Sequence, residues 1–293
     1  LVGSEMCIRD SLSFAGRVVI DWENFEGIGL AGLSELCNYA LVTPSLAAKW
    51  APGRLVDSRQ CYEALKMNVL LPPAKSRSVM FRSMHTIHEA DRGGLTVSPR
   101  PGLYENVCEL DFESQFPNII VKFNISYDTV IGYGKVLAKP KGFLPRITEY
   151  WLNRRLKFKH LAKQLPESDP RKQWADERQR ALKSMLVVTY GYSGCPWNRF
   201  SNVKCFEEIN RISRETMVKT INIAEEMGFK VIYADVDSIF VQKLGAELSD
   251  YEELCEKIER ETNLPISIDL SLIHISEPTR PLYISYSVFC LKK

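Results

Sequence analysis

The chain has 293 residues, enough for one large domain or two of ordinary size. Hydrophobic residues make up 45% of it and charged residues 25%, which is typical of a globular protein and excludes a disordered tail or a collagen-like repeat. The formal net charge of +2 argues neither for nor against a nucleic-acid partner, so only local clusters of charge can indicate one. No long uninterrupted apolar run occurs, and we expect no membrane-spanning helix and no membrane partner.

The cysteines and the N-terminus bear on the cellular compartment. None of the eight cysteines forms a C-x-x-C pair or a zinc-ligand spacing, and most lie in apolar stretches, which predicts buried thiols of a reducing compartment. The N-terminal stretch lacks the basic and apolar regions of a secretory signal. We therefore expect an intracellular protein.

The pattern along the chain predicts an α+β fold in six segments. Residues 1–11 do not read as native protein, and residues 12–75 are interpreted as a linker or N-terminal remnant with one short helix ended by Pro72-Pro73. Residues 76–149 are strand-rich, with turns at Gly93-Gly94 and at 99–102. A helical hairpin over 150–192 follows, with its second helix capped by Asp169-Pro170 and ending at Tyr190-Gly191. The segment 193–262 is predicted to contain a helix over 207–227, a strand-turn-strand over 229–244 and helices near 250–262, before a last segment, 263–293.

The predicted hairpin carries an excess of positive charge. Between Trp151 and Lys183 there are ten Lys or Arg residues against four Asp or Glu residues. Arg155 and Lys159 stand four residues apart, hence on one helix face. This pattern fits either a solvated basic surface or a phosphate-binding face.

Two acidic strand ends are the candidate chemical centre. Asp235-Val236-Asp237 lies between the apolar runs VIYA and SIFV, where a tight hairpin would bring both carboxylates near its turn, although a polar turn alone would look the same. Asp111 ends the strand NVCELD and is followed by a turn into a helix, a geometry that suits a triphosphate with its metal. Two divalent cations held by aspartates are the recurring device for phosphoryl and nucleotidyl transfer. The residues therefore favour a nucleotidyltransferase.

These motifs resemble those of family B DNA polymerases. DFESQFPNII resembles D-F-x-S-L-Y-P-S-I-I, YADVDSIFV resembles Y-x-D-T-D-S, KSMLVVTYG falls at K-x-x-x-N-S-x-Y-G, and RRLKFK resembles the R-x-x-x-K helix of the fingers. GGLTVSPRPGLYENVCELDF and RQCYEALKMNVLLPP are similar to the segments that precede the first motif. The resemblance covers roughly residues 50–270. It implies an antiparallel palm sheet with packed helices in 76–149 and 193–262, and a helical-hairpin fingers subdomain in 150–192.

The resemblance also implies roles for single residues. It implies catalysis by Asp111, Asp235 and the supporting Asp237, with two Mg²⁺ ions bound by Asp111, Asp235 and the carbonyl of Phe112. The substrates it implies are primer-template DNA and deoxynucleoside triphosphates. The implied nucleotide contacts are Ser114, Gln115, Phe116, Arg155, Lys159, Lys183 and Tyr190, with Phe116 as the ring that excludes a 2′-hydroxyl. The implied DNA contacts are Gly93, Gly94, Gly191 and Tyr233.

Departures from the motifs leave alternatives open. Val187 and Val188 replace Asn-Ser in the fingers motif, and Gln115 replaces Leu. The main alternative is a non-catalytic polymerase relative that binds DNA or partner subunits, and a third reading is a sugar-nucleotide transferase with a D-x-D motif. Asp21-Trp22-Glu23 imitates the D-x-E of a proofreading exonuclease, but no second acidic cluster follows it, which favours a linker turn.

The two ends of the chain differ from its body. LVGSEMCIRDS, at residues 1–11, and residues 271–293 resemble translated sequencing-adapter DNA. The chain leaves the polymerase pattern near Asp269-Leu270, where a thumb is expected to begin. We expect residues 271–293 to be extended or poorly ordered and not to dock, and the isolated chain to bind primer-template weakly.

Overall fold

The computed structural model describes residues 28–74, 81–90, 93–269, 273–277 and 288–291. Residues 1–11 and the Asp21-Trp22-Glu23 motif lie outside the described residues. The described chain forms two compact units, and both are discontinuous in sequence. The hairpin unit contains residues 28–74, 149–192 and 197–200, and the sheet unit contains the remaining described residues.

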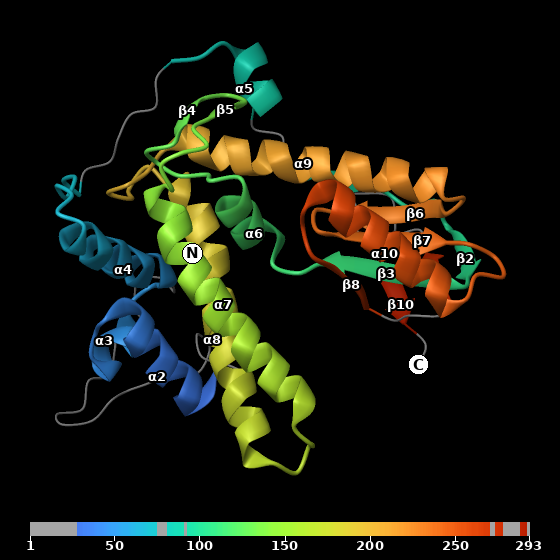
Figure 1. Ribbon diagram of the computed structural model, residues 1–293, viewed down its shortest axis with the longest axis horizontal. Coiled ribbons are helices and arrows are strands. Elements are labelled where there is room, and N and C mark those ends of the chain that lie inside the picture. Colours follow the sequence, from blue (N-terminus) through green and yellow to red (C-terminus); the bar gives the residue numbers. More distant parts are fainter. Residues whose placement is uncertain (1–27, 75–80, 91–92, 270–272, 278–287, 292–293) are drawn as a thin grey trace, which may run out of the picture. The chain divides into compact units, whose positions relative to one another are not determined.

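The hairpin unit is helical throughout. Its five helices are α2 (Gly29–Ala40), α3 (Pro44–Lys49), α4 (Pro52–Lys66), α7 (Phe143–Gln164), whose first turns belong to the sheet unit, and α8 (Pro170–Ser193). Helices α7 and α8 form an antiparallel hairpin (Figure 1). The predicted hairpin is confirmed, but α8 continues through Gly191 to Ser193. Helix α4 covers the predicted short helix, whereas α2 and α3 were not predicted. The helical spacing of Leu33, Leu36 and Ala40, all buried in α2, is the sequence signal that could have predicted α2.

A buried carboxylate connects three helices of the hairpin unit. Glu35 on α2 is fully buried and forms ion pairs with Arg154 on α7 and Arg178 on α8. The hydrogen bonds that Arg154 donates to the Glu35 carboxylate raise the pKa of Arg154, against the opposing effect of burial. Both guanidinium groups also lie over the ring of Phe158. Since a buried charge is tolerated only when it is paired, Glu35 fixes α2 to both helices of the hairpin.

The sheet unit is built on an antiparallel five-stranded sheet. The strand order is β1-β6-β7-β3-β8, with bounds β1 (Thr96–Val97), β6 (Lys230–Asp235), β7 (Ser238–Gln242), β3 (Val107–Phe112) and β8 (Ile266–Asp269). Strands β4 (Val130–Gly132) and β5 (Lys135–Val136) form a separate ladder. A third sheet contains β2 (Gly102–Glu105), β9 (Ile273–Glu277) and β10 (Val288–Leu291).

Helices cover one face of the main sheet. The helices of this unit are α5 (Met84–Ala90), α6 (Gln115–Lys122), α9 (Val203–Glu226) and α10 (Leu248–Thr262). Helix α9 contacts β6, and α10 contacts β8 (Figure 1). Leu110 and Phe112 on β3, Ala234 on β6 and Ile239 on β7 are buried, and side chains alternate between the two faces of a strand. The residues that alternate with these point to the opposite face of the sheet, and near the β6–β7 turn most of them are polar.

Most sequence expectations for this unit are confirmed. The α+β class, the strand-turn-strand at β6–β7 and the helices α9 and α10 are present. Residues 273–277 and 288–291 are extended as expected, and β9 pairs with β10 and with β2. The expectation that residues 271–293 do not dock as a native element stays a prediction. Of the cysteines that the structure describes as free thiols, Cys108, Cys205 and Cys255 are buried as expected, whereas Cys37, Cys61 and Cys195 are partly exposed. Among the described residues, no helix is both long and apolar enough to cross a membrane.

Candidate active site

Two of the predicted catalytic carboxylates lie in one row of the main sheet. Asp235 on β6 and Asp111 on β3 both pair with Ser238 on β7, from opposite sides. Thr96 pairs with Asp235 and Ser267 pairs with Asp111, which extends the row over all five strands. Directly paired residues point to the same face of a sheet, and strands about 4.8 Å apart place the Cα atoms of the two aspartates about 10 Å apart. The sheet therefore brings Asp111 and Asp235 together on its face opposite the helices.

The turn that joins β6 to β7 is held by three backbone hydrogen bonds. Val236 has φ 49°, in the left-handed region where a β-branched residue is rare. Its amide donates to the carbonyl of Leu95 at 3.0 Å, and the amide of Asp237 donates to the carbonyl of Asp235 at 2.5 Å. The amide of Phe112 donates to the carbonyl of Asp237 at 2.8 Å. The side chain of Asp237 is exposed, while its backbone connects the turn to β3.

The same face carries two acids that sequence reasoning missed. Glu109 precedes Asp111 by two residues on β3 and pairs with Asp269 on β8. Burial, then the charges of Asp269, Asp111 and Asp237, raises the pKa of Glu109 to about 7. Five carboxylates thus belong to one region of the sheet, and their mutual repulsion favours any cation that binds there. The alternation of Glu109 and Asp111 along the strand was the available signal.

Tyr233 also lies beside Asp235. It precedes Asp235 by two residues on β6, and its phenol is hydrogen-bonded to that carboxylate. Burial, then the charge and hydrogen bond of Asp235, raises the pKa of Tyr233. The ring packs against Phe240 with a centroid distance of 5.5 Å. The tyrosine is therefore fixed on the face that carries the two aspartates.

The segment after Asp111 turns directly into helix α6. Ser114 has φ 54° and stands at the N-cap of α6. Gln115 is buried, and its Oε1 accepts a hydrogen bond from Ser213 on α9 at 2.7 Å. Among the described residues, its Nε2 has no partner. Phe116 is half-buried in the first turn of α6. The substitution of Gln for Leu at position 115 therefore comes with a polar contact to α9.

Gly93 and Gly94, the glycine pair predicted to contact DNA, lie next to the turn that contains Asp235 and Asp237. Gly93 has φ 64°, and its carbonyl accepts from Arg214 on α9 at 2.7 Å. A Cβ atom on Gly94 would lie 2.7 Å from Cγ2 of Val236, so only glycine fits this close approach. The glycine pair and the D-V-D turn are thus packed together, which the sequence did not predict.

The predicted triphosphate cations belong to the hairpin unit. Arg155 on α7 is 6% exposed, Lys159 is half-buried and Lys183 on α8 is exposed. Tyr190 is half-buried and Gly191 is exposed in the last turns of α8. Val187, where the motif has Asn, is 51% exposed, so its substitution leaves the hairpin core intact.

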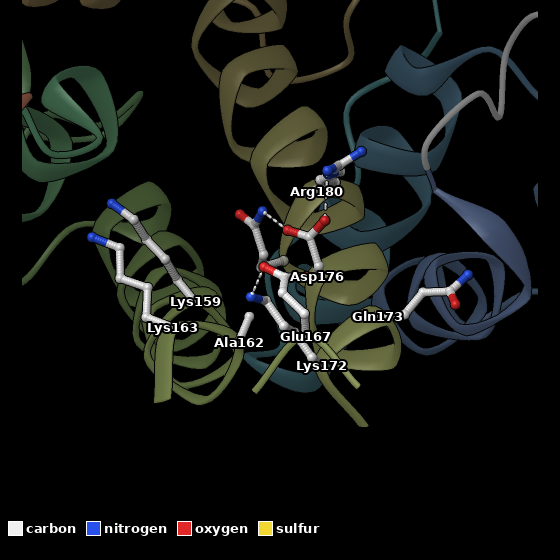
Figure 2. Close-up of a pocket in the computed structure, with 9 residues that line it drawn as sticks. Lys159, Ala162, Lys163, Glu167, Lys172, Gln173, Asp176 and Arg180 are labelled. Carbon is white, nitrogen blue, oxygen red and sulfur yellow. Dashed lines mark hydrogen bonds and ion pairs between the residues drawn. The ribbon is translucent and has the colours of Figure 1, made fainter. Parts of the chain in front are cut away.

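The hairpin unit also contains a charged pocket of about 640 Å³. Figure 2 shows residues from α7 and α8 that line it, among them Lys159 and Lys163. Arg180 pairs with Asp176, and Lys172 pairs with Glu167 (Figure 2). Two of its four cations are therefore neutralised within the pocket, so its net charge is only modestly positive.

The oxygen atoms on the sheet suit a magnesium ion better than a transition metal. The predicted donors are carboxylates and a backbone carbonyl, which are hard ligands. Magnesium binds through one or two carboxylates, with waters and substrate phosphates completing its shell. Within the described ranges, no group of three or more His, Cys, Asp or Glu side chains is arranged to hold a metal ion. The donor set fits an ion that is bound together with a phosphate-bearing substrate.

Comparison with known proteins identifies the family. The sequence profile of DNA polymerase family B matches residues 60–139 and 134–275, a range that includes every candidate site residue. The chain belongs to DNA polymerase family B. It is similar to DNA polymerase 2 of Saccharolobus solfataricus, with 30% identity over 219 residues that cover 72% of this chain and 32% of that protein. It is also similar to the DNA polymerase of Archaeoglobus fulgidus, with 32% identity over 228 residues, covering 74% of this chain and 28% of that protein.

The fold agrees with that of a solved family B polymerase. The structure of the family B DNA polymerase from Pyrobaculum calidifontis superposes with a TM-score of 0.64 and 27% identity, over 87% of this chain and 33% of that one. The chain thus spans about a third of the length of its family B relatives. This agreement confirms the predicted fold class and the polymerase resemblance.

Proposed function

We propose that this chain carries the nucleotide-adding centre of a DNA-directed DNA polymerase. The single observation that supports this most is the pairing of Asp111 and Asp235 with the same residue, Ser238, from opposite sides. That register holds two carboxylates on one face of a rigid sheet, where preorganised charges act on a reaction without rearranging. The substrates in this proposal are a primer-template DNA and deoxynucleoside triphosphates, and the reaction joins the primer 3′-hydroxyl to the α-phosphate with release of pyrophosphate.

Two Mg²⁺ ions fit the donor set of the proposed centre. Asp111, Asp235 and the carbonyl of Phe112 would hold them, and when bound they would stabilise the charge on the attacking and leaving oxygens. Asp237 would support this group through its backbone, which connects the turn to β3. Glu109 and Asp269 would increase the negative potential that attracts the ions.

The remaining predicted residues would bind the substrates. The backbone amides of Ser114 and Gln115, at the start of α6, would donate to phosphate oxygens of the nucleotide. Arg155, Lys159 and Lys183 would neutralise its triphosphate, with Tyr190 and Gly191 next to the base pair being formed. Gly93 and Gly94 would contact the template strand, and Tyr233 would lie near the primer end.

A single-turnover assay tests this function. The chain in excess over a labelled primer-template, with Mg²⁺ and the complementary deoxynucleotide, should extend the primer by the templated nucleotide only. Excess protein compensates for weak DNA binding. Absence of templated extension, with DNA binding retained, would instead favour the non-catalytic relative, an alternative that the apolar Val187 and Val188 support.

Replacing Lys183 by alanine should lower kcat/KM for the nucleotide by about a hundredfold, because a cation that binds the triphosphate stabilises charge in the transition state. The affinity for DNA should change little. Lys157, an exposed lysine on the same hairpin at one of the unspecified positions of the R-x-x-x-K motif, provides the matched control, and Lys157→Ala should extend normally. If Lys183→Ala only weakens DNA binding and makes it more sensitive to salt, the lysine belongs to a general phosphate-binding surface.

Replacing Phe116 by alanine should increase ribonucleotide incorporation relative to deoxynucleotide, on the order of tenfold or more, because the ring no longer blocks the 2′-hydroxyl. Phe116→Tyr keeps the ring and should leave the ratio unchanged. The measurement is the ratio of kcat/KM for the two sugars. An unaltered ratio in the alanine variant would show that this ring does not select the sugar.

A further inference from the structure

We propose that Thr96 positions the Asp235 carboxylate for cation binding, an inference that rests on the proposed function. Thr96 Oγ1 donates a hydrogen bond to Asp235 Oδ1 at 3.1 Å. Thr96 and Asp235 are direct cross-strand partners in the β1–β6 ladder, so the contact follows from the sheet register and does not depend on a flexible loop. Thr96 lies in the segment GGLTVSPRPGLYENVCELDF, in which only Gly93 and Gly94 were predicted to contact a substrate.

The residues that lead into Thr96 are held in place by hydrogen bonds. Arg214 donates to the carbonyl of Gly93 at 2.7 Å. The amide of Val236 donates to the carbonyl of Leu95 at 3.0 Å, and Gly94 packs on the Val236 side chain. Because Val236 and Asp235 are neighbours, the short strand β1 and the aspartate turn form one hydrogen-bonded unit.

Neutral hydroxyls on two strands therefore orient Asp235. Thr96 on β1 donates to one carboxylate oxygen, and the phenol of Tyr233 on β6 is also hydrogen-bonded to the carboxylate. A carboxylate has about four acceptor sites. These two hydrogen bonds therefore select one side-chain orientation and leave the remaining acceptor sites for a cation. Because the donors are uncharged, they do not neutralise the group. Partners of this kind commonly change metal affinity by about 10- to 100-fold when removed.

Thr96→Val tests the inference, because valine keeps the β-branched shape and strand preference of threonine but removes the hydroxyl. We expect the Kd for Mn²⁺, measured by calorimetry on the whole chain without DNA or nucleotide, to rise about tenfold. The Mg²⁺ concentration for half-maximal extension should rise in parallel, with the rate restored at saturating Mg²⁺. Thr96→Ser keeps the donor and should behave like the wild-type chain in both measurements.

Asp235→Ala separates failure of the inference from failure of the proposed function. If Asp235→Ala abolishes Mn²⁺ binding while Thr96→Val binds as tightly as the wild-type chain, Thr96 has no positioning role and the proposed centre still stands. If Asp235→Ala binds Mn²⁺ and extends the primer normally, both proposals are wrong. A Thr96→Val defect that saturating Mg²⁺ does not restore would also overturn the inference, since it would indicate damage to the sheet.

Discussion

Asp235→Ala is expected to abolish primer extension, with a loss in rate of at least about a thousandfold, or about 4 kcal/mol of transition-state stabilisation. Asp111→Ala should have the same effect, because the two residues flank Ser238 equivalently. The affinity for primer-template should stay within a few fold, since the carboxylates stabilise the transition state and do not grip DNA. Single-turnover extension and DNA-binding titrations measure the two effects separately.

A carboxylate elsewhere in the sheet unit provides the control for this experiment. Glu226, at the end of α9, is exposed and forms a surface ion pair with Lys257 at 3.5 Å. Glu226→Ala removes the same charge and should extend the primer at the normal rate, because such pairs contribute little. Normal extension by Asp235→Ala or Asp111→Ala would exclude the proposed centre.

Glu35→Ala is expected to destabilise the hairpin unit by about 3 kcal/mol or more, because it leaves two arginines that are mostly buried without their shared counter-charge. Amide hydrogen exchange in α2, α7 and α8 measures this free energy locally. Exchange in these helices should accelerate by a factor of about a hundred or more.

The control for Glu35 is another glutamate of the hairpin unit. Glu167 pairs with Lys172, but its side chain is 90% exposed, so Glu167→Ala should change stability by less than about 1 kcal/mol. Glu35→Gln, which keeps the shape and loses the charge, should resemble Glu35→Ala. Equal exchange rates in Glu35→Ala and the wild-type chain would show that Glu35 does not hold the three helices together.

Local patterns in the sequence predicted most of the elements, but not how strands that are distant in sequence pair. The alternation in VIYADVDSIFV was enough for the β6–β7 hairpin, because both strands and their turn are contiguous. Thr96 is 139 residues from Asp235, and no local period relates them. Their contact depends on the order of strands in the sheet, which becomes visible only when the chain is folded.

The candidate site was predictable where a motif concentrates its residues and not where the sheet adds others. Asp111 and Asp235 stand in motifs with a fixed spacing, and the structure places them in one row. Glu109, Asp269 and Glu35 stand in no motif, and their effects depend on burial and on neighbours that are distant in sequence. The helices α2 and α3 were missed because Gly and Pro near their ends resembled linker composition.

The ion pairs of Glu35 have a consequence for the order of folding during synthesis. Arg154 lies 119 residues and Arg178 lies 143 residues after Glu35. Strands β1 and β3 of the main sheet lie between Glu35 and Arg154 in the chain. Helices α2 to α4 leave the ribosome long before either arginine exists, and domains generally fold as units once their chain is complete. Glu35 therefore stays hydrated until the hairpin has been made, and the closure of this long loop is expected to be a late and slow step of folding.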